Sequence, residues 1–571
     1  MMTSHSQQKA QQKAQRDPLD AGSAQTFDAQ TFDAQTFDAI VIGSGIGGLT
    51  VAALLAKLHH QRVLVLEQHF TVGGFTHGFS RKGKFHWDVG LHYVGDMNPG
   101  STGRAVFDYL TEGNLAWQQM PDVFETFVYP DVSFAVHSDA QRFQADLVQQ
   151  FPHEKSSIRQ YFRDVQKAEF WFAAHALLEL LPSQLHPLLR RGIRLFGAIA
   201  RQTTQRYLDD HFQDPHLKAL LVSQWGDYGL PPSQSCFGIH SLIVAHYLKG
   251  GWYPVGGAQA IAQTMVPVIE KAGGRVLTQR RVSEVLIDAR VAVGVRAQHG
   301  AKTTAGGSAV ETYYAPTVVS DAGAFNTYTK LIPQDYSLPM RSAIQSFPKG
   351  NSMVTVYLGL KESAQKLGFQ GENHWIYTTY DHDVIAQASP SDQSPQFCYL
   401  SFPSLKDPLA KGHTAEIIAH IPYDFFSRWR QQPWRRRGQD YADLKAQLTE
   451  SLIQLVETHY PGFADLIEYA ELSTPLTVEH FDASDRGAIY GIPCIPERLD
   501  QPWVAARTPI KNLYLTGADT FSPGIMGAMM GGVKTVGLLG GPLGFFKVMA
   551  TITRASSKKE TRRDCARMIS T

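Results

Sequence analysis

The sequence predicts an α/β protein with a discontinuous nucleotide-binding domain, because two similar segments lie at opposite ends of the chain. Near the N-terminus, the apolar run Ala39–Ile42 leads into a glycine-rich turn, an Ala/Leu-rich helix and a second apolar run, Val63–Leu66. Short apolar runs joined by a helix are typical of buried parallel strands. Near the C-terminus, Asn512–Leu539 repeats the order of strand, turn and helix. Both ends are therefore expected to share one parallel sheet.

The turn after the first strand has the GxGxxG spacing of a Rossmann-like dinucleotide site. It consists of Gly43, Ser44, Gly45, Ile46, Gly47 and Gly48. Gly43 permits the tight turn, and Gly45 lets the backbone approach a pyrophosphate at the N-terminus of the helix that follows. Glu67 ends the second strand, where a carboxylate accepts hydrogen bonds from an adenosine ribose. This context predicts a dinucleotide cofactor.

The rear segment favours a flavin over a nicotinamide nucleotide. The chain has one GxGxxG unit followed by an acid, and no second such unit. Asp519 comes shortly after Gly517 at the end of a strand, where it can bond the ribityl hydroxyls that only a flavin has. The helix that begins near Gly524 directs its positive end toward the ring and stabilises negative charge on the reduced flavin. We therefore predict FAD as the cofactor.

Composition excludes several other classes of protein. Hydrophobic residues make up 43% and charged residues 18% of the 571 residues, which is a globular composition with room for more than one domain. The net charge of +1 provides no broad field for nucleic acid. Four scattered cysteines without CxxC or metal-ligand spacing predict no disulfide framework and no metal site, and favour the reducing cytoplasm. No signal-peptide core or run of 18 apolar residues occurs, so any membrane contact would be peripheral.

Changes of pattern along the chain predict the domain organisation. The FAD-binding domain is expected in three parts, residues 37–110, 250–335 and 485–548. A helical substrate or lid region is expected at 111–249, and an α+β substrate domain with its sheet and helices at 336–484. A disordered polar tail is expected at 1–36 and a C-terminal tail at 549–571. Further predicted elements are the strands Met353–Leu360, Phe397–Phe402 and Glu416–Ile421, the strand and turn Val318–Phe325, and the helix Tyr441–Thr458.

The segment Phe170–Gln202 has a wide apolar face and four arginines, Arg190, Arg191, Arg194 and Arg201. Core packing explains this face, and the alternative is an amphipathic surface that dips into a bilayer and admits lipid substrate. The sequence leaves both interpretations open.

Several motifs together resemble a known family. In chain order they are the front glycine turn, Gly73-Gly74, Phe85–Gly95, Trp225–Ser235, His246–Gly257, Gly487–Gly491 and the Gly517/Asp519 segment. The set, which spans most of residues 37 to 545, resembles the all-trans-retinol 13,14-reductase (retinol saturase) branch of the phytoene desaturase and carotenoid isomerase superfamily. The resemblance implies a fold like that of amine oxidases and GDP-dissociation inhibitors, with FAD extended through the cofactor domain.

The resemblance also implies which residues line FAD. Besides the six residues of the glycine turn and Glu67, they are Gln68, Gly73, Gly74, Val282, Gly517, Asp519 and Met526, with Val282 contributing its backbone to the adenine. The chain departs from the family at Phe75, where amine oxidases carry Arg and closer relatives often a small residue. The contacts of residues 75 to 77 with the flavin are therefore left open.

Candidate catalytic residues lie within the family-like motifs, because redox chemistry at a C=C bond needs a proton donor or a carbocation stabiliser beside the flavin. They are His92, Tyr93, Asp227, Tyr228 and His246, with Tyr247 as a further candidate. Trp252, Tyr253 and Tyr490 are candidate aromatic walls for a polyene. Each of these side chains also has an ordinary structural explanation.

Three functions are compatible with these motifs. The first is an FAD-dependent oxidoreductase that acts on a C=C bond of a retinoid, carotenoid or related isoprenoid, with a separate electron donor or acceptor such as NAD(P)H or a redox protein. The second is a carotenoid cis–trans isomerase or a phytoene-type desaturase with the same cofactor site. The third is a lipid-escort protein of GDP-dissociation-inhibitor type without flavin, against which Glu67 and the Gly517/Asp519 segment both argue.

Overall fold

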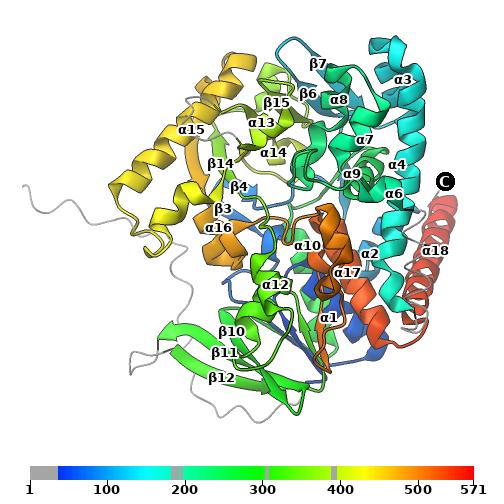
Figure 1. The fold of residues 1–571 in the computed structure, drawn as a ribbon, viewed down its shortest axis with the longest axis vertical. Helices are drawn as coiled ribbons and strands as arrows, with labels where there is room; N and C mark the ends of the chain where they lie inside the picture. The colour runs from blue at the N-terminus through cyan, green and yellow to red at the C-terminus, as the bar shows by residue number, and fades with distance from the viewer. Residues whose placement is uncertain (1–36, 182–191, 193–196, 303–307, 388–394, 571) are drawn as a thin grey trace, which may run out of the picture. The chain divides into compact units, whose positions relative to one another are not determined.

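The start, the middle and the end of the chain contribute strands to one parallel sheet, which carries the glycine-rich turn (Figure 1). Its order is β19 (Leu513–Leu515), β13 (Val318–Ser320), β1 (Ala39–Ile42), β2 (Val63–Leu66) and β9 (Arg275–Leu277). In register, Ile40 of β1 lies opposite Leu64 of β2 and Val318 of β13. The predicted discontinuous α/β fold is confirmed.

The structure is a computed structural model that describes residues 37–181, 192, 197–302, 308–387 and 395–570. The polar tail predicted at 1–36 lies outside the described residues, as does the part of the apolar, arginine-containing segment at 182–191 and 193–196.

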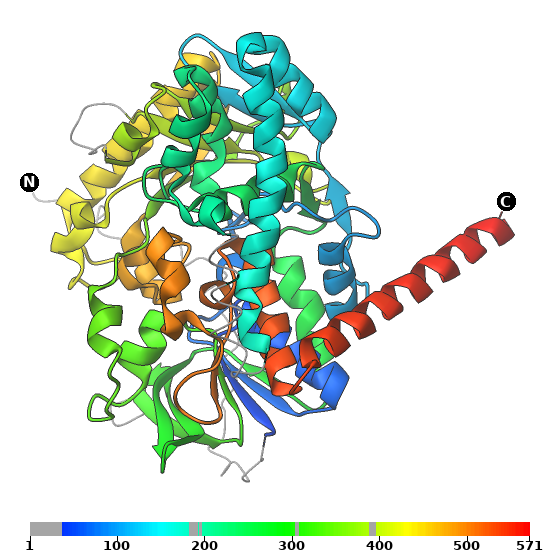
Figure 2. The ribbon, with the colours of Figure 1, turned by 45° about the vertical axis from the view of Figure 1, so that its right-hand side comes forward.

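Helices from both ends of the chain cover one face of the parallel sheet. They are α1 (Ile46–His59), α2 (Thr102–Leu110), α10 (Gln259–Lys271), α17 (Gly524–Leu539) and α18 (Gly544–Ser570), and their inner side chains form one apolar core with the sheet. Within α17, Lys534 is buried, donates to the Thr520 carbonyl at 2.6 Å and pairs with Glu179. The first turns of α18 pack through Phe545, Val548 and Ile552, and the helix then continues past the other elements (Figure 2).

An antiparallel three-stranded sheet covers the opposite face. It consists of β10 (Arg280–Asp288), β11 (Val291–Lys302) and β12 (Ser308–Tyr314), and it packs with α11 (Ala324–Asn326) and α12 (Arg341–Ser346) against β1, β2, β13 and β19. Both faces of the parallel strands are therefore covered, which explains why these strands are continuous apolar runs in the sequence.

A mixed seven-stranded sheet forms the second part of the molecule. Its order is β18 (Ile467–Ser473), β14 (Met353–Leu360), β17 (His413–His420), β16 (Phe397–Ser401), β15 (Asn373–Tyr377), β6 (Val123–Val128) and β7 (Ser133–His137). Only the β15–β6 pair is parallel among these described strands. One face packs against α15 (Gln439–His459), α14 (Pro403–Lys406) and α16 (Pro475–Asp482).

The other face of this sheet packs against the helical layer predicted between residues 111 and 249. The helices are α3 (Ala140–Gln150), α4 (Lys155–Ala176), α6 (Ala198–Arg201), α7 (Thr204–His211), α8 (Pro215–Leu221) and α9 (Phe237–Tyr247), together with α13 (His382–Gln387). At the start of this region, β6 and β7 form an edge hairpin of the substrate sheet. Two short antiparallel pairs, β3 (Gly78–Arg81) with β4 (Phe85–Asp88) and β5 (Trp117–Gln119) with β8 (Trp252–Pro254), complete the described strands.

Of the segment Phe170–Gln202, the described start lies at the end of α4 and is partly buried. Trp171 and Phe172 are buried in the helical layer, whereas Phe170 is 77% exposed. Within the described residues, no helix combines the length and apolar character that crossing a membrane requires.

The contact between α1 and α17 makes a prediction about stability. A Cβ atom added at Gly532 on α17 would lie 2.7 Å from Thr50 Cβ and 2.8 Å from the Gly47 carbonyl oxygen. Because neither atom can swing away, we expect Gly532→Ala to lower the free energy of unfolding by about 1–3 kcal/mol. Gly300→Ala is the matched control, since its Cβ would meet no atom closer than 3.6 Å, and we expect a change within about 0.5 kcal/mol. Urea unfolding of both variants measures the difference, and equal stability would contradict the close packing.

Candidate active site

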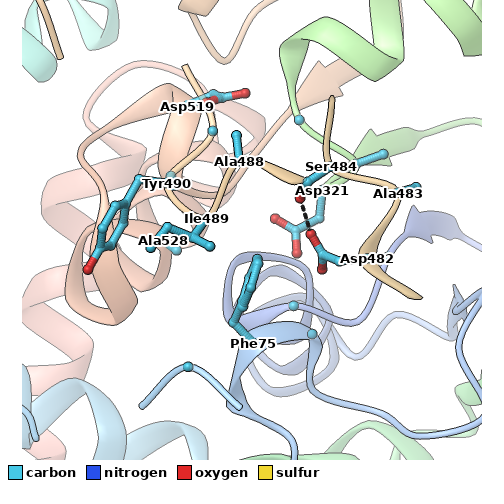
Figure 3. Close-up of a pocket in the computed structure, with 18 of the residues that line it drawn as sticks. Phe75, Asp321, Asp482, Ala483, Ser484, Ala488, Ile489, Tyr490, Asp519 and Ala528 are labelled. Atoms are coloured by element: carbon cyan, nitrogen blue, oxygen red, sulfur yellow. Dashed lines mark hydrogen bonds between the residues drawn. The ribbon is translucent and has the colours of Figure 1, made fainter. Parts of the chain in front are cut away.

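A cavity of about 600 Å³ runs from the glycine-rich turn to the seven-stranded sheet. One part lies along the carboxyl ends of β1, β2, β13 and β19, which is where ligands bind in open parallel sheets. The other part lies between α17 and the substrate sheet, and Phe75 and Tyr490 stand beside the junction (Figure 3). One connected space is therefore available to a cofactor and a substrate.

The nucleoside end of the cavity centres on Glu67. Its carboxylate is buried and accepts hydrogen bonds from the Ser44 backbone N–H at 2.9 Å, the Ser44 hydroxyl at 2.7 Å and the His69 backbone N–H at 2.7 Å. Gln68 and Val282 also line this end, and the Gln68 side chain donates to the Phe481 carbonyl. Glu67 is thus fixed where the sequence predicted a ribose contact.

The two ends of the chain meet at the glycine-rich turn. A Cβ atom on Gly47 would lie 2.5 Å from the Gly517 Cα, and one on Gly74 would lie 3.0 Å from the Gly45 Cα. Gly517 also has a φ of 83°, in the left-handed region that favours glycine. Glycine at these positions leaves room for the backbone of α1 to approach a pyrophosphate.

Asp519 links three segments of the cofactor domain. One carboxylate oxygen accepts the Ala324 N–H at 2.7 Å, and the other accepts the Ile492 N–H at 2.8 Å. Arg498 donates to the Ile492, Ala518 and Asp519 carbonyls and so fixes the same loops. Each carboxylate oxygen keeps a second lone pair for a ligand hydroxyl, and Asp519 lines the cavity (Figure 3).

The start of α17 borders the cavity through one face of the helix. Gly524, Ile525 and Ala528 line it, which follows the i, i+4 spacing of one helix face. Met526 does not line it, because its Cε lies toward α2, only 2.4 Å from the position of a Cβ on Gly103. Gly48 and Gly517 do not line the cavity either. The other predicted cofactor residues do line it: Gly43, Ser44, Gly45, Ile46, Gly47, Glu67, Gln68, Gly73, Gly74, Val282 and Asp519. This set fits an extended dinucleotide with polyol hydroxyls.

The second part of the cavity is apolar and aromatic. Its walls include Phe75, Met353, Trp375, Phe397, Tyr399, Ile418 and Tyr490. His92 and Asp227 are the polar candidates from the sequence that line it. Apolar walls with a few convergent polar groups are typical of a site for a hydrophobic small molecule.

Asp227 belongs to a buried chain of hydrogen-bonded groups. The Tyr93 hydroxyl lies 2.6 Å from Asp227 Oδ2 and also contacts Glu125 Oε1. Glu125 accepts two further hydrogen bonds, from Trp375 Nε1 at 2.8 Å and from Gln224 Nε2 at 2.6 Å. Three donors stabilise Glu125 as the anion, and the single phenol proton cannot serve both carboxylates. One of the two acids must therefore supply the proton for its own contact with Tyr93.

The electrostatics agree with this arrangement. Burial, and next the charge of Glu125, raise the pKa of Asp227 well above its ordinary value. Burial raises the pKa of Glu125 to about 7, against the lowering effect of its hydrogen bonds. Because the two acids are adjacent, they titrate as a pair, and the pair retains a proton at neutral pH.

His92 belongs to a second polar group behind the cavity wall. Its Nδ1 lies 2.9 Å from Oε2 of Glu416, a residue with no solvent exposure. Lys406 donates to the His92 carbonyl at 2.7 Å, to Asn373 and to Ser401, and burial lowers the pKa of its amine to about 7. Burial raises the pKa of nearby Asp88 to about 7. These contacts fix the backbone and ring of His92.

The remaining candidates lie outside the cavity. Tyr228 faces His240 in the helical layer, and His246 accepts the Gly95 N–H through Nε2 at 2.8 Å. Tyr247 stacks on Tyr93, and Tyr253 donates to buried Asp88. Trp252 pairs with the backbone of Val94. The structure thus places His92, Asp227 and Tyr490 in the cavity and Tyr93 directly behind it.

Three cavity acids, Asp321, Asp482 and Asp485, were missed by sequence reasoning. Asp321 follows β13, and its position at the carboxyl end of a parallel strand is a signal that could have identified it. Asp482 ends α16 and carries no comparable signal. Burial raises the pKa of Asp482 to about 6.

Comparison with known proteins gives consistent results. The chain matches the family of flavin containing amine oxidoreductases over residues 46–538. It is 34% identical over 519 residues to all-trans-retinol 13,14-reductase of Danio rerio, across 86% of this chain and 84% of that protein. It is 26% identical over 549 residues to prolycopene isomerase 2, chloroplastic, of an Oncidium hybrid cultivar, across 89% of this chain and 84% of that protein.

Solved structures share the fold at low identity. The cyclohexylamine oxidase of Brevibacterium oxydans has a TM-score of 0.56 and 14% identity, over 91% of this chain and 99% of its own. The resemblance drawn from the sequence motifs is confirmed at the level of the family. The chain belongs to the flavin-containing amine oxidoreductase family, with retinol 13,14-reductases and prolycopene isomerases among its relatives.

Proposed function

We propose that this protein is an FAD-dependent oxidoreductase of CH–CH groups that saturates a C=C bond of a retinoid- or carotenoid-like polyene. The observation that carries the proposal is the buried Asp227 carboxyl, held by Tyr93 in the wall of an apolar chamber that is continuous with the dinucleotide site. Reduction of an unactivated C=C bond needs one hydride and one proton, and this cavity offers a place for the source of each. The match to all-trans-retinol 13,14-reductase supports the choice of substrate class.

Different residues of the cofactor site would bind different parts of FAD. Glu67 would accept hydrogen bonds from the adenosine ribose, the N-terminal turn of α1 would hold the pyrophosphate, and Asp519 would accept the ribityl hydroxyls. When bound there, FAD supplies hydride transfer at its ring nitrogen. The positive end of α17, at Gly524, borders the chamber and favours negative charge on the ring.

Asp227 would deliver the proton. Tyr93 contacts the Asp227 carboxyl and holds it in place. The Tyr93 hydroxyl donates its own proton to Glu125, so Asp227 keeps its proton and can transfer it to the substrate. FAD bound in this site would supply the hydride for one alkene carbon, and Asp227 would give its proton to the neighbouring carbon. Asp227 is then left as a carboxylate, and the product carries two more hydrogen atoms than the substrate.

The chamber selects its substrate mainly by shape. A polyene gains roughly 25 cal/mol for each Å² of apolar surface removed from water. Trp375, Phe397 and Tyr399 offer flat aromatic walls, and Phe75 also lines the cavity. Exclusion of water by these side chains also keeps Asp227 protonated.

The alternative activity is a redox-neutral cis–trans isomerisation, as the match to a prolycopene isomerase suggests, or a desaturation. The same cofactor site serves all three reactions, so the product distinguishes them. A non-catalytic escort protein would need neither Glu67 and Asp519 in the cofactor site nor Asp227 in the apolar chamber.

The test uses the purified protein loaded with FAD and reduced by light without oxygen, with EDTA as a sacrificial electron donor in place of the natural one. All-trans-retinol and prolycopene are each added to the reduced protein, phytoene is added to the protein with oxidised FAD, and products are analysed by chromatography and mass spectrometry. We expect a retinoid product two hydrogen atoms heavier, with oxidation of the flavin. An isomer of unchanged mass from prolycopene would support the alternative. Protein that cannot be loaded with FAD would refute both.

Asp227→Asn should abolish proton delivery while leaving the cofactor site intact. General acids contribute typically 10²–10⁴-fold to a rate, so we expect flavin reoxidation by substrate to slow by at least about 100-fold at unchanged FAD content. The control is Asp131→Asn, which alters a similar Tyr–Asp pair with Tyr380 on the protein surface. An unchanged rate in Asp227→Asn would remove Asp227 from the mechanism.

The pH profile of this step tests the paired acids. Because the active form of Asp227 is the acid, the rate should fall on the alkaline side, as pH rises through the raised pKa of Asp227. The charge of Glu125 contributes to that raised pKa, so Glu125→Gln should shift the alkaline limb to lower pH. Single-turnover rates between about pH 6 and pH 10 measure the shift, and a limb that stays in place would contradict the coupling.

Glu67 and Asp519 should determine retention of FAD. We expect Glu67→Gln to weaken binding by roughly tenfold, because one charge-assisted hydrogen bond contributes about 1.5–3 kcal/mol. Asp519→Asn should weaken it further, since it also loses an acceptor for the Ala324 or Ile492 N–H. Absorbance near ~450 nm after gel filtration reports bound flavin. Full FAD content in the double variant would contradict the assigned site.

A further inference from the structure

The carboxyl group of Asp321 lies inside the glycine-rich turn. Cβ atoms added to Gly45 and Gly47 would each lie 2.6 Å from one of its oxygens, and one added to Gly48 would lie 3.0 Å away. Its position is fixed at both ends, since the Asp321 N–H donates to the Ile42 carbonyl at 2.8 Å and the carboxyl accepts from the Gly48 N–H. Asp321 therefore sits at the N-terminus of α1, where the pyrophosphate is expected.

The groups that face Asp321 make this an unfavourable place for a carboxylate. Glu67 from β2, Asp482 from the end of α16 and Asp519 after β19 all approach it, and Figure 3 shows Asp321, Asp482 and Asp519 around the same cavity. The helix α1 contributes only backbone N–H groups. Within the described residues, no Lys, Arg or His forms an ion pair with Asp321.

A bound diphosphate would add further negative charge at the same helix terminus. An ionised Asp321 would then oppose the cofactor, whereas a protonated Asp321 is neutral and can donate a hydrogen bond to a phosphate oxygen. Glu67, in contrast, needs its negative charge to accept the ribose hydroxyls and already receives three hydrogen bonds. Within this cofactor site, Asp321 and Glu67 therefore need opposite charge states.

Building on the FAD site proposed above, we propose that Asp321 binds the flavin dinucleotide as its neutral acid and donates a hydrogen bond to the diphosphate. Binding of FAD above the titration range of the free acid then takes up one proton from water. The residue acts in cofactor binding and takes no part in the redox step.

The titration of Asp321 in the protein without cofactor supports this assignment. Burial, followed by the neighbouring carboxylates Asp482, Glu67 and Asp519, raises the pKa of Asp321 to about 8, against the hydrogen bond from Gly48. The bound diphosphate raises the pKa of Asp321 further, because it adds negative charge. A group with a higher pKa in the bound state strengthens binding below its free-state pKa, and that advantage is lost as pH rises above about 8.

The experiment measures the dissociation constant of FAD for the apo-protein between about pH 6.5 and pH 9.5. We expect the constant to be flat at low pH and to rise by up to about tenfold for each pH unit above the pKa of free Asp321. Calorimetry in two buffers of different ionisation enthalpy counts the protons, and we expect uptake approaching one proton per FAD near pH 9. A pH-independent affinity without proton uptake would overturn the proposal.

Two variants isolate Asp321 from other titrating groups. Asp321→Asn keeps a hydrogen-bond donor but cannot ionise, so its affinity should stay flat to about pH 9.5 with no proton uptake. Asp482→Asn removes a neighbouring charge and should move the wild-type transition to lower pH. Asp131→Asn should behave like the wild type. An Asp321→Asn protein with the wild-type pH dependence would overturn the proposal, whereas failure of every protein to bind FAD at any pH would refute the FAD site itself.

Discussion

Backbone contact between the two ends of the chain is the constraint on which the rest of this structure depends. Gly47 and Gly517 face each other so closely that no side chain fits between them. The contact places the N-terminus of α1 beside the turn after β19, and α17 then packs along α1. Asp519 and Arg498 fix the surrounding loops through backbone hydrogen bonds. A cofactor that spans this junction contacts segments from the start, the middle and the end of the sequence at once.

The sequence predicted the elements of this junction well because they obey local rules. The strands β1 and β2 were expected at their observed bounds, since strands buried on both faces are continuous apolar runs. The same rule identified β14, whose residues are nearly all buried. The rule did not identify β6 and β7, which form an edge hairpin within a mostly helical segment. Composition of the surrounding region outweighed the local pattern there.

The candidate site was harder to predict, because side chains meet there through tertiary packing. Asp227 was a candidate from its motif, but its chemistry depends on Glu125, which lies on a distant strand and attracts the hydrogen bonds of Tyr93, Trp375 and Gln224. Met526 was placed in the cofactor site, and the helix phase turns it away while Ala528 borders the cavity. Asp321 was overlooked because dinucleotide motifs direct attention to glycines and to the acid after the second strand. Its role becomes visible only when the glycines are seen to leave room for its carboxyl group.

Burial of a carboxyl group beside another carboxylate serves cofactor binding at Asp321 and proton transfer at Asp227. Both acids are buried, and a second carboxylate nearby raises each pKa. At the end of the cavity beside the parallel sheet, a neutral Asp321 carboxyl avoids repulsion of an anionic cofactor and can donate a hydrogen bond to it. At the apolar end, a neutral carboxyl can give its proton to carbon. In each place the neighbouring anion is held by its own donors, Glu67 by Ser44 and His69, and Glu125 by Tyr93, Trp375 and Gln224. At the apolar end, the donors to Glu125 favour Asp227 as the acid that keeps the proton, and burial raises the pKa of both acids.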